Sequence, residues 1–223
     1  MALCDNETQG IQPVPARIGN GDKPDDNLYW GSDEGFASIF RKAPGWKVER
    51  SEQNPAPGIL RRMVLKHAAS QTTLQADAYQ GREMKKCLED FESCLVSGQC
   101  DLAAFVGHNG LMDFQVNKPA PGPKGCDAIV LCCLSREYFA KRLEFLKARP
   151  LLLTEQLMYP GSFILRDALD VWIAGGKPEA IRAAAARAYA RNQGLSTKAA
   201  LGVFSNLPQA PAAPVPEVPR TKP

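Results

Sequence analysis

Two side chains that are suited to act together in thiol chemistry each follow a short apolar run. Leu102–Val106 runs into Gly107 and His108, and Ala128–Cys132 runs into Cys133. Apolar runs of this length are typical of strands that are buried on both faces of a parallel sheet. Parallel strands end at the same edge of a sheet, and neighbouring strands lie about 4.8 Å apart. We therefore expect the imidazole and the thiol to face each other, as nucleophilic catalysis by a cysteine requires.

The residues around this pair suit a reactive cysteine. Ser135 is placed to cap a helix over residues 135–147, which would put Cys133 beside a helix amino terminus, a position that favours thiolate over thiol. Backbone N–H groups near Gly110 and Cys133 are expected to receive an oxyanion. Structural interpretations stay open, because a Cys that ends a buried strand is often a small core residue and His108 could serve only in structural hydrogen bonds.

Four further side chains are candidates for holding a substrate: Asp77, Asp113, Ser135 and Arg136. Asp77 is expected in a strand-to-helix turn, and Asp113 follows the His108 loop. Either carboxylate could select a Lys or Arg side chain of a substrate. The alternative interpretation is that both carboxylates are solvated or cap turns, and that Ser135 and Arg136 are a helix cap and a surface charge.

The composition narrows the class of protein. Of 223 residues, 44% are hydrophobic and 23% are charged, which is typical of a soluble globular domain. The net charge of +3 comes without a long basic run, so we expect no nucleic-acid partner. No apolar stretch has the length of a membrane span. The first residues lack the apolar centre of a signal peptide, which favours a cytoplasmic location; a periplasmic one, after removal of a leader, is the alternative.

Cysteine and histidine usage gives no sign of a metal or another cofactor. The chain has seven Cys, two of them adjacent, and only two His, and it contains no CxxC motif. This inventory leaves little for a zinc site, so we expect neither metal nor cofactor. The odd number of cysteines argues against a regular disulfide framework and favours a reducing compartment.

Three regions differ in composition. Residues 1–26 are polar and rich in Gly, Pro and Asp, which predicts a flexible or loosely draped segment. Residues 206–223 are rich in Pro and predict a disordered tail, either simply solvated or available to a protein partner. Strand and helix patterns alternate over residues 27–205 and predict one α/β domain, a three-layer α/β/α sandwich with a mostly parallel central sheet. A ligand site is expected at the carboxyl ends of its central strands. The expected strands are 27–30, 58–67, 72–76, 102–106, 111–114, 128–132 and 151–154, and the expected helices 35–42, 81–96, 135–147, 162–173, 178–190 and 197–204.

The two strand ends resemble those of the caspase-like (clan CD) cysteine peptidases. The segment LAAFVGHNG looks like their strand and His-Gly segment, and DAIVLCCLS looks like the strand that ends in the nucleophile. This alignment puts Cys132 in the small-residue position and Cys133 on the nucleophile. Residues 150–190 are similar to the strand and helices after the Cys in bacterial CHAT-like and separase-like members. The resemblance covers residues 27–205. Asn109 interrupts the usual His-Gly pair, and the His-to-Cys spacing is shorter than the roughly 50 residues of caspases.

The resemblance implies a cysteine peptidase that needs no cofactor and acts on a peptide or protein substrate. The Cys133 thiolate would attack a peptide carbonyl, His108 would protonate the leaving amine, and water would release the acyl group. A catalytically inactive caspase-like module that binds a protein partner is the first alternative. A different α/β enzyme, using the same strand ends on a non-peptide acyl substrate, is the second.

Overall fold

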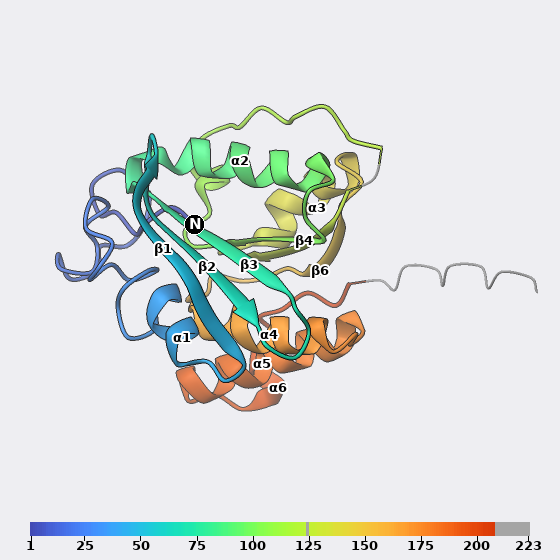
Figure 1. Ribbon diagram of the computed structural model, residues 1–223. Helices are drawn as coiled ribbons and strands as arrows, with labels where there is room; N and C mark the ends of the chain where they lie inside the picture. Colours follow the sequence, from blue (N-terminus) through green and yellow to red (C-terminus); the bar gives the residue numbers. More distant parts are fainter. Residues whose placement is uncertain (124, 208–223) are drawn as a thin grey trace, which may run out of the picture.

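A computed structural model describes residues 1–123 and 125–207 as a mixed α/β fold with two three-stranded sheets (Figure 1). The first sheet is antiparallel and the second is parallel. The chain thus forms one small parallel sheet, over residues 102–152, beside an antiparallel one, and not the single mostly parallel central sheet that was expected. Short turns join the strands of the first sheet, and such turns permit only antiparallel pairing. The strands, in sheet order, are β1 (Trp46–Ala56), β2 (Ile59–His67) and β3 (Thr73–Tyr79), then β4 (Leu102–Val106), β5 (Asp127–Leu131) and β6 (Arg149–Leu152).

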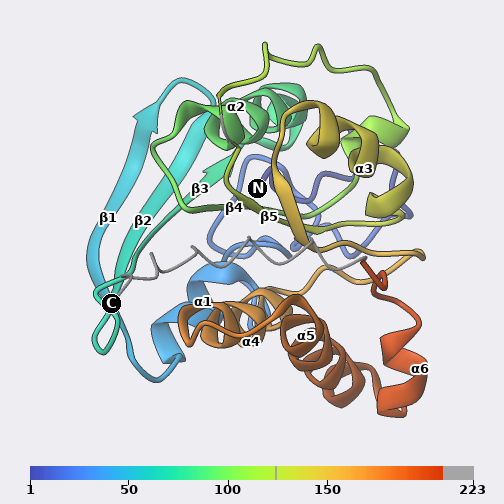
Figure 2. The same cartoon turned by 90° about the vertical axis from the view of Figure 1, so that its right-hand side faces the viewer.

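Helices lie over both faces of the parallel sheet, as Figures 1 and 2 show from two sides. Alternate residues of β5 explain this arrangement. Val130 packs with the residues of α2 and α3, whereas Ile129 and Leu131 pack with those of α4 and α5. A strand with apolar side chains on both faces needs a cover on each. The helices are α1 (Phe36–Lys42), α2 (Met84–Ser97), α3 (Ser135–Phe145), α4 (Ser162–Ile173), α5 (Pro178–Gln193) and α6 (Thr197–Leu201).

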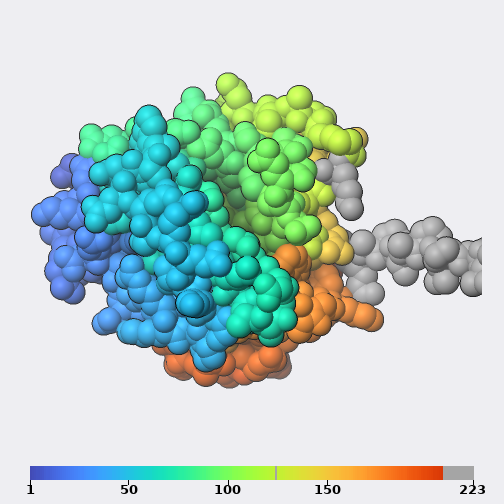
Figure 3. Space-filling view, in the orientation of Figure 1, coloured from blue at the N-terminus to red at the C-terminus, as the bar shows by residue number. Residues whose placement is uncertain are grey.

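Strand β1 lies on the surface of the molecule, where the blue part of the chain occupies the front of the space-filling view (Figure 3). It pairs with β2 alone, which makes it the edge of the antiparallel sheet. Its residues Glu49, Arg50 and Ser51 are exposed. Charged side chains on an edge strand discourage pairing with other chains.

The first residues of the chain lie in the core, which corrects the expectation of a flexible segment there. Ala2, Leu3 and Cys4 are fully buried. The Leu3 N–H donates to the Tyr79 carbonyl, and the Tyr79 N–H donates to the Met1 carbonyl, so this segment extends the pairing of β3. The amino terminus lies beside β3 in Figure 1, as this pairing requires. The polar average composition of residues 1–26 conceals the short apolar run at residues 2–4, which is buried beside β3.

Two expected strands are absent from the described part of the chain. Residues 27–30 form a turn, because the buried Asn27 side chain accepts hydrogen bonds from the N–H groups of Cys4 and Tyr29. Gly110–Met112 forms one turn of 3-10 helix where a strand was expected. Of the expected tail at residues 206–223, the part from residue 208 onward lies outside the described residues. None of the helices within residues 1–123 and 125–207 has the length and apolar character needed to cross a membrane.

Candidate active site

Strands β4 and β5 place His108 and Cys133 at the same edge of the parallel sheet, as predicted. The two strands are in parallel register, with Val106 opposite Leu131. The Gly107 N–H continues this ladder by donating to the Leu131 carbonyl at 3.1 Å. Gly107 has a φ of 142°, a conformation that side chains with a Cβ rarely adopt, and the chain turns there. His108 and Cys133 thus leave adjacent strands at the same level.

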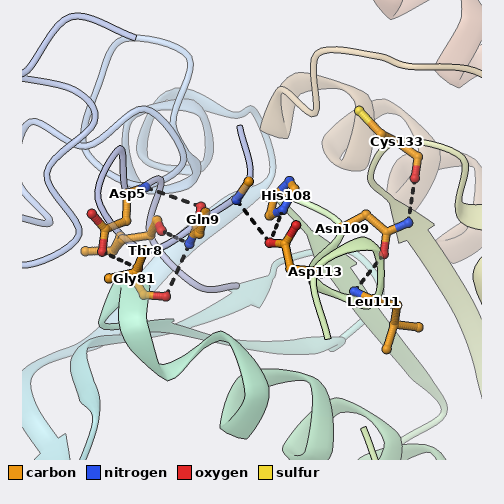
Figure 4. Close-up of polar contacts among 11 residues, drawn as sticks. Asp5, Thr8, Gln9, Gly81, His108, Asn109, Leu111, Asp113 and Cys133 are labelled. Carbon is orange, nitrogen blue, oxygen red and sulfur yellow. Dashed lines mark hydrogen bonds and ion pairs between the residues drawn. The ribbon is translucent and has the colours of Figure 1, made fainter. Parts of the chain in front are cut away.

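The His108 imidazole is held by a carboxylate. Its Nε2 lies 2.7 Å from Oδ2 of Asp113, and the residue is only 7% exposed (Figure 4). The same carboxylate oxygen accepts a hydrogen bond from the Gly10 N–H at 3.1 Å. Asp113 follows the 3-10 turn Gly110–Met112, which brings it back toward the histidine. Asp113 was a candidate for selecting a basic substrate side chain, with a solvated or capping carboxylate as the alternative; its carboxylate instead contacts the imidazole.

The Cys133 thiol contacts the loop that follows β6. The Met158 N–H donates to Sγ at 3.3 Å, and Sγ lies 3.5 Å from the Met158 carbonyl oxygen. Cys133 is partly exposed, whereas Cys132 is buried in the core, and burial raises the pKa of Cys132 well above its ordinary value. This difference supports the assignment of Cys133, not Cys132, as the reactive member of the pair. Within the part of the chain that the structure describes, no hydrogen bond joins Cys133 to His108.

Asn109 connects the two strand ends and was missed as a site residue. Its side chain is fully buried and donates from Nδ2 to the Cys133 carbonyl at 2.7 Å (Figure 4). Its Oδ1 accepts a hydrogen bond from the Leu111 N–H at 3.2 Å. In the sequence this residue stood out only as a departure from a His-Gly pair. The available signal was an Asn at the start of a turn, where its side chain commonly bonds the backbone two residues on.

Tyr29 is a second residue beside the pair that sequence reasoning did not place there. Its ring is buried and lies in van der Waals range of the position that a Cβ on Gly107 would occupy. Burial raises the pKa of Tyr29 well above its ordinary value, and the neighbouring Cys4, Cys133 and Tyr159 side chains add to the shift. Tyr29 therefore remains a neutral phenol beside Cys4 and Cys133.

Ser135 was a candidate for holding a substrate, with a helix cap as the alternative, and its hydrogen bonds are made within the protein core. It is fully buried, and its hydroxyl donates to the Val130 carbonyl at 2.9 Å. Its N–H donates to the Thr154 hydroxyl at 3.0 Å, and the Thr154 N–H donates back to the Ser135 hydroxyl at 2.8 Å. Thr154 also donates to the Cys132 carbonyl. These bonds tie the start of α3 to β5 and to the end of β6, so Ser135 has a structural role.

The remaining candidates lie away from this network or already form ion pairs or hydrogen bonds within the protein. Asp77 lies within β3, where Arg62 of β2 makes a two-pronged ion pair with it at 2.6 and 2.7 Å, and it takes no part in the contacts of His108. Arg136 is exposed and pairs with Glu155 on the surface. The N–H of the buried Gly110 donates to the His108 carbonyl at 3.1 Å, so it is not free for an oxyanion in this conformation.

Two cavities of the described part of the chain lie away from the pair. One of about 220 Å³ is lined by Asp5 and Arg82, among others, and one of about 270 Å³ by Glu34 and Phe163, among others. Neither His108 nor Cys133 lines them. Within residues 1–123 and 125–207, no group of three or more His, Cys, Asp or Glu side chains is arranged to hold a metal ion.

Comparisons with known proteins identified no relative of this chain. No protein-family model, no curated protein and no solved structure matches the chain.

Proposed function

We propose that this protein is a cysteine hydrolase of caspase-like architecture that acts on peptide or protein substrates, with Cys133 as nucleophile and His108 as base. The observation that carries the proposal is the in-register pairing of β4 and β5, which brings both residues to one sheet edge. Helices on both faces of this sheet support an α/β/α sandwich. The motifs at both strand ends, LAAFVGHNG and DAIVLCCLS, resemble those of the caspase-like peptidases.

The contact with Asp113 determines which nitrogen of His108 is available. A carboxylate accepts hydrogen bonds, so the nitrogen that faces it, Nε2, carries a proton. In the neutral imidazole the lone pair then resides on Nδ1. Nδ1 is therefore the atom that would take the proton of the Cys133 thiol. The nearby carboxylate also stabilises the imidazolium that this transfer creates.

The proposed reaction follows from these positions. The Cys133 sulfur attacks the carbonyl carbon of the substrate, and a tetrahedral intermediate forms. The carbon–nitrogen bond then breaks, and the His108 imidazolium gives its proton to the departing amine. A water molecule, deprotonated by the same imidazole, attacks the thioester and releases the acid and the free thiol. Before the first step, the thiol must rotate from its contact with Met158 toward His108.

The second candidate is a catalytically inactive module that binds a protein partner. Two observations favour it: the thiol is engaged by Met158, and His108 is nearly buried. The two candidates differ in the reactivity of one sulfur atom. A base-activated cysteine is alkylated faster than an ordinary thiol, because the thiolate is the reacting species.

Alkylation by iodoacetamide near neutral pH, followed over time by peptide mass spectrometry, tests the proposal. We expect Cys133 to be labelled faster than the other cysteines, and its rate to fall about tenfold or more in His108→Ala. Asp113→Asn should lower the rate less, because it removes the orienting group and retains the base. His67→Ala, the only other histidine of the chain, is the matched control and should leave the rate unchanged.

Either of two results would favour the inactive module: Cys133 reacting no faster than the other six cysteines, or reacting equally fast without His108. If the thiol proves activated, a peptide library and a set of small acyl esters should be compared as substrates. Cleavage of esters alone would indicate a non-peptide acyl hydrolase.

A further inference from the structure

Three cysteine side chains gather at the amino edge of the parallel sheet, opposite the edge that carries His108 and Cys133. Cys94 lies in the last turns of α2, Cys100 lies just before β4, and Cys126 directly precedes β5. The sulfur atoms of Cys94 and Cys100 are 2.7 Å apart, and those of Cys100 and Cys126 are 3.5 Å apart. All three residues are partly exposed, so a small oxidant can reach the group.

The sulfur separations distinguish a redox pair from a metal site. A disulfide bond is about 2.05 Å long, so Cys94 and Cys100 need only a small approach to form one. Two cysteine ligands of a tetrahedral zinc ion, each about 2.3 Å from the metal, lie roughly 3.8 Å from each other. The separation of 2.7 Å is too short for two such ligands. The cluster therefore fits oxidation better than metal binding.

We propose that Cys94 and Cys100 are a site of oxidation to a disulfide, and that Cys126 is the alternative partner of Cys100. With a disulfide oxidant such as oxidised glutathione, the Cys100 thiolate attacks one sulfur of the oxidant and releases one glutathione thiolate. The Cys94 thiolate then attacks the Cys100 sulfur of the mixed disulfide and releases the second. Two protein thiols lose two protons and two electrons, and the oxidant is reduced to two thiols.

The surroundings of the cluster indicate a structural bond in preference to a rapidly exchanging one. Burial raises the pKa of Cys94 to about 12 and that of Cys126 to about 12, and the contact of each with Cys100 adds to the shift. A thiol with a high pKa attacks slowly near neutral pH and is a poor leaving group. The disulfide should therefore form faster as the pH rises and should be slow to reduce once formed. It would join the end of α2 to the chain that enters β4.

Three single substitutions test the proposed pairing, because Cys100 is the residue that both others contact. The full chain and its variants are treated with oxidised glutathione at mildly alkaline pH, free thiols are blocked, and disulfide-linked peptides are identified by mass spectrometry. We expect a Cys94–Cys100 bond in the unaltered protein and in Cys126→Ser. Cys94→Ser should form Cys100–Cys126 instead. Cys100→Ser should form no disulfide within the cluster. Its mass should therefore not fall by the two hydrogen atoms that a disulfide removes.

The midpoint of thermal unfolding provides an independent readout. Closing the short loop between Cys94 and Cys100 should raise Tm by roughly 4–9 °C relative to the reduced protein, by the loop-entropy relation. Cys100→Ser should show no such rise on oxidation. The proposal would be overturned if oxidised protein contained no Cys94–Cys100 bond, if Cys100→Ser gained the same stability, or if reduced protein bound one zinc ion per chain that Cys100→Ser did not bind.

Discussion

Replacement of Asn109 by alanine should weaken the connection between the two strand ends that carry the site. Asn109 is fully buried, and its amide bonds the Cys133 carbonyl and the Leu111 N–H. Alanine leaves both groups without this partner. An unmatched buried polar group costs about 1–3 kcal/mol, and Leu111 is partly exposed, so water can compensate at its N–H. We therefore expect the free energy of unfolding to fall by about 2 kcal/mol, which lowers Tm by roughly 4–8 °C in a domain of this size.

Asn109→Asp is the matched variant, because it keeps the shape of the side chain and replaces the donating amide group by a carboxylate oxygen. A carboxylate cannot donate to the Cys133 carbonyl, and it places a negative charge in a buried position. The loss of stability at neutral pH should be at least as large as for alanine. It should shrink as the pH is lowered, since burial favours the protonated acid, which can donate.

Urea unfolding followed by tryptophan fluorescence measures this loss of stability. The slope of the unfolding free energy against urea concentration should be the same for all variants, which shows that the same transition is observed. The alkylation rate of Cys133 is the second readout, because altered geometry at its carbonyl should change that rate and leave the other cysteines unaffected. If both variants unfold within about 0.5 kcal/mol of the unaltered protein, the Asn109 contact does not hold the strand ends together.

Two further predictions concern stability. Arg142→Met should lower the free energy of unfolding by about 3–5 kcal/mol, because it leaves the buried Glu92 carboxylate without its two-pronged partner. The control is Lys86→Gln, which breaks an exposed pair with Asp90 and should lower the free energy of unfolding by about 0.5 kcal/mol at most. Similar losses for the two variants in urea titrations would contradict this reasoning. Burial raises the pKa of Cys4 from about 9 to about 11, so the folded state keeps a proton that the unfolded chain releases, and the free energy of unfolding should fall as the pH rises through this window. Urea titrations at several pH values should show a shallower fall in Cys4→Ala, and an unchanged slope would refute the assignment.

Much of the framework of the site was predictable from local sequence patterns. The run Leu102–Val106 is the strand β4 with the same ends, and 128–132 differs from β5 by one residue at each end. Apolar runs indicate strands covered on both faces, and the pairing of such strands in parallel sheets is geometrically restricted. The placement of His108 and Cys133 at one edge follows from those two facts. The helix Ser162–Ile173 was likewise evident from its periodicity.

Several contacts of the site join residues far apart in the chain, and only the tertiary structure shows them. The Gly10 N–H reaches the carboxylate of Asp113 across 103 positions, and the Met158 N–H reaches the Cys133 sulfur across 25. A sequence window reports the preferences of its own residues, whereas these partners are selected by how the whole core packs. The same reason explains why Ser135, which as a residue type suits a cap or a substrate contact, is a buried link between strands.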